Sequence, residues 1–146
     1  MPVTTSHQAR ATDYADAMTL TLDEPTDRPA IDWARAIIER SPAWARLTLP
    51  PGWRVLGLDL APTHAPDHVH GWAVVVDRPR EVVLAARSRL GFDARLSVEV
   101  GDDGRTVGFR TAVRHDGVLS RRLWQAIGLP HRVMVGQMMR HAASGR

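Results

Sequence analysis

The sequence predicts one α+β domain in which a curved antiparallel sheet of about six or seven strands wraps around a long C-terminal helix. Two late segments show alternating apolar residues and are joined by an Asp-Gly turn at residues 101–104, which is typical of a hairpin with one dry face. Apolar residues elsewhere repeat at helical spacing. A length of 146 residues suits one domain. We place this domain at residues 12–144, after a flexible tail at residues 1–11.

The first half of the chain predicts a strand, a helix and a short helical turn. Residues 14–22 end in Met and Leu alternating with Thr, which indicates a half-buried strand. Pro29 suits the first turn of a helix at residues 27–41, and one more helical turn follows. A loop is expected at Pro50–Gly52. Five further strands are then expected at residues 53–60, 71–77, 81–89, 92–100 and 105–114.

The C-terminus predicts two helices that cover the dry face of the sheet. Residues 118–127 form the first, and Gly128 is expected to end it as a C-cap. Pro130 is expected to open the second, because a missing N–H costs little in a first helical turn. Met134 and Met138 lie on the apolar side of that helix. This order of elements favours a helix-grip arrangement.

The composition argues against several function classes. No cysteine is present, which excludes disulfides, thiolate chemistry and zinc–thiolate sites. All 19 basic residues are arginine and are scattered among 16 acidic ones, so we expect no nucleic-acid partner. The sequence has neither a signal-peptide pattern nor a run of about 20 apolar residues. We therefore expect a cytoplasmic protein without membrane insertion.

Four stretches resemble the SRPBCC, or START-like, superfamily of helix-grip proteins and, within it, an uncharacterised bacterial family. They are Asp13–Asp16, Leu56–Leu58, Val107–Arg114 and Leu129–Arg132, and the resemblance covers about residues 13–143. The stretch Ser120–Trp124 departs from that family, which often has Gly-Arg before an aromatic residue there. The resemblance implies a cavity for apolar ligands between sheet and helix. It implies no fixed catalytic residues, because relatives share the fold and not one chemistry. We expect no cofactor.

The candidate ligand contacts lie on the faces that should meet inside this cavity. Aromatic side chains suit flat organic ligands, and thioether side chains adapt to varied shapes. Ordinary core packing would explain the two methionines equally well. The residues that we expect to contact a ligand are Trp72, Phe109, Thr111, Trp124, Met134 and Met138.

Polar candidates for chemistry are fewer. Asp59 and His115 lie at strand ends, where a carboxylate and an imidazole could move protons. His131 is either an acid–base group in the cavity or a structural residue at a helix start. One loop also carries ligand types that suit transition metals, although their spacing matches no motif and a solvated loop is the simpler interpretation. These loop residues are His64, His68 and His70.

Two function classes stay open at this point, and a structural partner domain is a weaker third. The first is a module that binds a lipid-like or polyketide-like apolar metabolite. The second is a cyclase, dehydratase or isomerase of natural-product biosynthesis that works in the same cavity without metal or cofactor. We expect an apolar small molecule as partner, and a monomer or homodimer.

Overall fold

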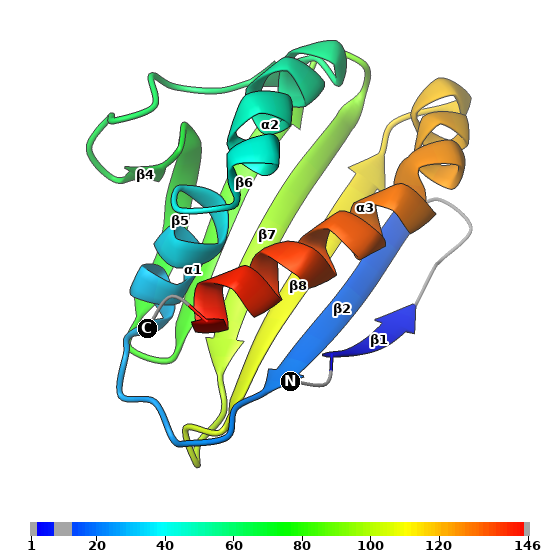
Figure 1. The fold of residues 1–146 in the computed structure, drawn as a ribbon. Helices are drawn as coiled ribbons and strands as arrows, with labels where there is room; N and C mark the ends of the chain where they lie inside the picture. The colour runs from blue at the N-terminus through cyan, green and yellow to red at the C-terminus, as the bar shows by residue number, and fades with distance from the viewer. Residues whose placement is uncertain (1–2, 8–12, 145–146) are drawn as a thin grey trace.

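The structure is a computed structural model that describes residues 3–7 and 13–144. Figure 1 shows a curved sheet with the helices gathered on one of its faces. In chain order the elements are β1 (Val3–His7), β2 (Asp13–Thr21), α1 (Ala30–Ile38), α2 (Ala43–Val55), β3 (Leu58–Asp59), β4 (His68–Val69), β5 (Trp72–Arg78), β6 (Glu81–Ser88), β7 (Phe92–Val100), β8 (Thr106–His115) and α3 (Val118–Ser144).

The sheet is antiparallel between the paired strands. Its order is β1-β2-β8-β7-β6-β5-β4, and β3 pairs with β6 beside this path. With the long helix α3 lying across it, this is the α+β helix-grip fold that the sequence predicts. Strands from the two ends of the chain lie side by side, since β2 pairs with the last strand, β8.

Strand β7 explains why the sheet has one dry face. It occupies the residues predicted for it, and its inward side chains are all buried: Phe92, Ala94, Leu96, Val98 and Val100. Asp93, Arg95 and Glu99 between them are exposed. Strand β8 continues the pattern with its arginines outward. The apolar face is therefore covered by the helices, and the charged face is in water.

The segment after α1 differs from the prediction. The sequence predicts a loop at Pro50–Gly52 and a strand at residues 53–60, but α2 continues to Val55. Only the two-residue strand β3 remains of the expected strand. The prediction of a loop followed by a full strand is therefore wrong.

Two consecutive prolines do not break α2, and the residues whose carbonyls lose their donors are exposed. Pro50 and Pro51 lack the N–H groups that would bond to the carbonyls of Arg46 and Leu47. Both of these residues are exposed, so water can supply the missing donors. Leu49 is buried and ties the same turn to the core.

Helix α3 is continuous where the sequence predicts two helices, so the prediction of a helix end at Gly128 is wrong. A Cβ at Gly128 would lie 2.9 Å from Cε2 of Tyr14, so this glycine permits close approach to β2. Pro130 lies inside the helix. Pro130 and Ala126, whose carbonyl loses its donor, are both exposed. In Figure 1 the first turns of α3 stand at an angle to the long segment that crosses the sheet.

A strand occupies part of the segment where the sequence predicts a flexible tail. Strand β1 pairs with the edge of β2, with Val3 opposite Leu20 and His7 opposite Asp16. An edge strand offers unpaired backbone groups, so a polar segment can add to it without an apolar pattern of its own. The other residues of the predicted tail lie outside the described part of the chain.

Candidate functional site

A pocket lies between the dry face of the sheet and α3. Its walls come from the three helices and from β3, β5, β7 and β8, so segments far apart in the sequence meet there. Of its 16 lining residues 14 are apolar or aromatic, and the other two are Thr111 and His131. The wall of the pocket is therefore mostly apolar. Its volume is about 60 Å³, far below the roughly 300–1,000 Å³ of pockets for drug-sized ligands.

All six residues that we expect to contact a ligand line this pocket: Trp72, Phe109, Thr111, Trp124, Met134 and Met138. Those on β8 are two positions apart and so share its inward face. Those on α3 lie along the side of the helix that faces the sheet, where Trp124 and Met138 are buried. Met138 is 3% exposed, so the C-terminal helix does turn its apolar side toward the sheet.

Aromatic rings form two clusters in the wall. Trp72 and Trp53 meet edge to face with their centroids 5.9 Å apart, which joins β5 to α2. Trp124 meets Phe92 edge to face at 5.7 Å and lies 5.0 Å from the ring of Tyr14. Edge-to-face pairs at these distances are favourable beyond the area that they bury. The two ring clusters therefore stabilise the pocket wall where α2 meets β5 and where α3 meets β2 and β7.

One end of the pocket is polar. Thr111 lies directly opposite Asp16 in the β2–β8 ladder, and Nδ1 of His131 lies 3.5 Å from Oδ2 of Asp16. The hydroxyl of Tyr14 donates to the same carboxylate, and Arg132 donates to the Tyr14 hydroxyl over 3.3 Å. Thr111 and His131 line the pocket, whereas Asp16 is not among its lining residues.

The carboxylate form of Asp16 is favoured although the side chain is buried. Burial acts to raise the pKa of Asp16, but the contacts from His131 and Tyr14 and the charge of Arg132 outweigh it and hold this pKa below its ordinary value. Burial, and next the Asp16 carboxylate, raise the pKa of Tyr14. At neutral pH a neutral phenol therefore donates to a buried carboxylate at this end of the site.

Several buried polar atoms of the lining have no hydrogen-bond partner within the described part of the protein. They are Oγ1 of Thr111, Nε1 of Trp72, Nε1 of Trp124 and Nδ1 of His131. The His131 atom faces Asp16, at a distance too long for a good hydrogen bond. Buried polar groups in proteins are usually paired, so unpaired ones concentrated in one pocket need an explanation.

Two predicted catalytic candidates lie away from the pocket lining. Asp59 is exposed on β3 and lies opposite Arg87 in the ladder with β6. Nδ1 of His115 shares a 2.6 Å hydrogen bond with Oγ of Ser120, which joins the end of β8 to the first turn of α3. Of the three candidates only His131 is brought to the pocket.

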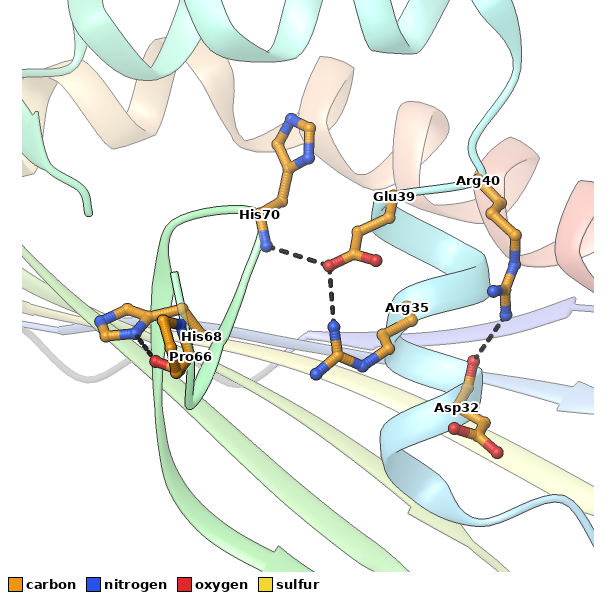
Figure 2. A network of polar contacts seen from close by, with 7 residues as sticks. All are labelled: Asp32, Arg35, Glu39, Arg40, Pro66, His68 and His70. Carbon is orange, nitrogen blue, oxygen red and sulfur yellow. Dashed lines mark hydrogen bonds and ion pairs between the residues drawn. The ribbon is translucent and has the colours of Figure 1, made fainter. Parts of the chain in front are cut away.

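The histidine loop is held by contacts with α1 and with itself. Figure 2 shows Glu39 between the guanidinium of Arg35 and the backbone N–H of His70, with N···O distances of 3.1 and 3.3 Å. Nδ1 of His68 lies 2.6 Å from the carbonyl oxygen of Pro66. Burial, against the opposing effect of Glu39, lowers the pKa of His70.

A metal site in this loop has no support from the structure. Within residues 3–7 and 13–144, no three His, Asp or Glu side chains come together in a way that could hold a metal ion. His64 is exposed, and the ring of His70 packs 5.5 Å from that of Trp53. The loop therefore packs against α2 through the contact between His70 and Trp53.

Asp16 and the part of the pocket wall formed by α2 are not among the site residues that the sequence predicts. The signal for Asp16 was present, because extending the alternation of β2 backward puts this carboxylate on the same face as Met18 and Leu20. Leu49 and Trp53 could not be found in the same way, since the prolines between them predicted a loop.

The fold and the pocket define the class of this protein: a helix-grip α+β protein with an apolar pocket between its sheet and its C-terminal helix. No protein-family model matches the chain, and no curated protein matches it. Among solved structures, the chain is similar to CalU16 from Micromonospora echinospora, with 8% identity and a TM-score of 0.38 over 99% of this chain and 91% of that one. None of the helices in the described residues is long and apolar enough to cross a membrane.

Proposed function

We propose that this protein binds a small, mostly apolar molecule in the pocket between the sheet and α3. The observation that carries the proposal is the composition of the wall, in which an apolar surface is interrupted by unpaired polar atoms. Binding sites for small molecules have this character, with a few polar groups that orient a ligand inside an apolar cavity.

The small volume of the pocket means that ligand binding requires a movement, and we assign that movement to α2. A pocket of about 60 Å³ has room for a few waters, so a ligand of metabolite size requires one wall to move. Helix α2 is suited to this movement, because only Ala45 and Leu49 of its 13 residues are buried and it contains two prolines. We therefore expect α2 to shift outward when a ligand enters.

Native mass spectrometry of the gently purified protein tests the proposal directly. We expect an apolar compound to be retained by the wild type and lost from the Ala94→Leu variant, because leucine adds three carbon atoms inside the small pocket. Ala126→Leu makes the same change on the exposed side of α3 and should retain the compound. Equal retention in both variants would place the ligand elsewhere, and a wild type without any would argue for a structural domain.

A second candidate function is catalysis in the same pocket, as in a cyclase, dehydratase or isomerase. The observation that favours it is the position of His131, whose imidazole lines the pocket and lies 3.5 Å from the Asp16 carboxylate. With the retained compound as substrate, His131→Gln should reduce turnover far more than affinity. Equal losses in both would argue for simple binding.

A further inference from the structure

The unpaired polar atoms of the pocket are not evenly divided between donors and acceptors. An indole N–H can only donate, so Trp72 and Trp124 each offer one donor and no acceptor. The hydroxyl of Thr111 can donate or accept. These three residues are 3%, 4% and 1% exposed, and all of them line the pocket. Water has little access to their polar atoms from outside the protein.

The lining residues offer fewer side-chain acceptors than donors. The set contains no Asp, Glu, Asn or Gln. Its one other polar member is His131, whose Nδ1 lies beside Asp16, so Nε2 is the single acceptor that a neutral ring would offer. A ligand that brings its own donors, such as an ammonium or amide N–H, would therefore add donors to a wall that already has more than it can pair. A ligand that brings acceptors would pair them.

The unpaired donors lie in different parts of the pocket. Trp124 and Thr111 belong to the polar end, where Trp124 meets the ring of His131 edge to face at 5.5 Å. Trp72 is on β5, which is separated from β8 by β6 and β7 in the sheet. Adjacent strands are about 4.8 Å apart, so the two positions suit acceptors at opposite ends of a ligand better than one shared atom.

We infer that the ligand of this pocket is an apolar compound whose polar atoms are hydrogen-bond acceptors, namely carbonyl or ester oxygens, and that it carries no amine. This inference rests on the proposed function. Thr111 and the indole N–H of Trp124 bind one acceptor oxygen, and the indole N–H of Trp72 binds an oxygen at the other end of a longer ligand. The apolar walls take the rest of the molecule.

The experiment compares three probes of nearly one shape on the full ¹⁵N-labelled chain. Acetophenone carries a carbonyl oxygen, α-methylstyrene has a CH₂ group in the place of that oxygen, and 1-phenylethylamine carries an ammonium group. The five tryptophans give separate indole N–H signals in nuclear magnetic resonance spectra. Trp72→Phe and Trp124→Phe assign the two signals that matter, and the 42% exposed Trp44 serves as internal control.

We expect acetophenone to bind more tightly than α-methylstyrene by about 2- to 10-fold, which is the range of one net hydrogen bond. It should move the indole proton of Trp124 or Trp72 downfield and leave Trp44 unchanged. Thr111→Val should lower the affinity for acetophenone, leave that for α-methylstyrene unchanged, and fold at least as stably, because it removes an unpaired buried hydroxyl.

Two results would overturn the inference while leaving the proposed function in place. One is equal binding of acetophenone and α-methylstyrene without a downfield shift. The other is a preference for the amine, which would mean that an acceptor faces the ligand. If none of the three probes binds and no compound is retained in native mass spectrometry, the proposed function fails and this inference fails with it.

Discussion

Replacing Gly128 with alanine should destabilise the fold through one contact between α3 and β2. The added Cβ would lie 2.9 Å from Cε2 of Tyr14 and 3.3 Å from its hydroxyl oxygen, whereas carbon atoms normally pack at about 3.5–4.0 Å. Tyr14 cannot easily turn away, because its hydroxyl bonds to Asp16 and Arg132 and its ring packs against Trp124. Helix or tyrosine must therefore shift.

The size of the effect follows from two opposing contributions. Overpacking of this kind costs about 1–3 kcal/mol, and alanine gains about 1 kcal/mol over glycine inside a helix. The matched control is Gly136→Ala in the same helix, which is also buried but whose Cβ would meet Met18 at an ordinary 3.9 Å. The control should be as stable as the wild type or more so, and Gly128→Ala should lie about 1–3 kcal/mol below it.

Urea unfolding followed by tryptophan fluorescence measures this difference, and thermal unfolding gives a second reading. A domain of this size loses roughly 4 °C of melting temperature per kcal/mol. The two variants should therefore separate by about 4–12 °C. Equal stability of the two variants, or a Gly128→Ala protein more stable than the control, would refute the close contact between Tyr14 and α3.

Further predictions concern the buried pair, the core and the surface. Tyr14 is the chain's one tyrosine and its pKa is raised, so phenolate absorbance should appear only above the ordinary tyrosine pKa of about 10. Asp16→Asn should move this titration to lower pH. A titration that does not move would contradict the pairing of Tyr14 with Asp16. The pKa of Asp16 is lowered in the fold, so its carboxylate stabilises the protein above about pH 4 and this contribution is lost as pH falls. The loss of unfolding free energy in Asp16→Asn should accordingly be largest at neutral pH. A loss that grew as the pH fell would mean that the pKa of Asp16 is raised in the fold and not lowered. Met138→Ala should lower the free energy of unfolding by about 2–5 kcal/mol. Met134 is only half-buried, so Met134→Ala should lower it clearly less. Equal losses in chemical denaturation would contradict the assignment of Met138 to the inner face of α3. Arg87→Ala removes an ion pair to each of two exposed carboxylates and should leave the unfolding free energy nearly unchanged, because exposed ion pairs contribute little. A clear loss of stability would contradict this.

The faces of the late strands and of α3 could be predicted because they depend on local periodicity. A strand alternates its side chains and a helix repeats every 3.6 residues, whatever the rest of the chain does. Thr111 and Phe109 could therefore be assigned to the inward face from β8 alone, and Met138 from its own helix. These residues then met in one pocket, because the sheet and α3 each bury a single apolar face.

The interruptions of the helices could not be predicted from the same local signals. Proline normally ends a helix, yet α2 passes through Pro50 and Pro51, and the residues whose carbonyls they leave unbonded are exposed to water. Gly128 normally marks a helix end, yet it lies inside α3 where Tyr14 needs room. In both cases the deciding neighbour is solvent or a residue from another part of the chain.

The polar end of the pocket could be predicted only in part from the local pattern of the sequence. Alternation along β2 is enough to turn Asp16 inward, but only tertiary packing decides that His131, Thr111 and Tyr14 surround it. Tyr14 and Gly128 are 114 residues apart and still touch, so no short window of sequence contains the contact. Side-chain direction is a property of backbone geometry at each residue, whereas the partner of a buried charge depends on how separate elements pack together.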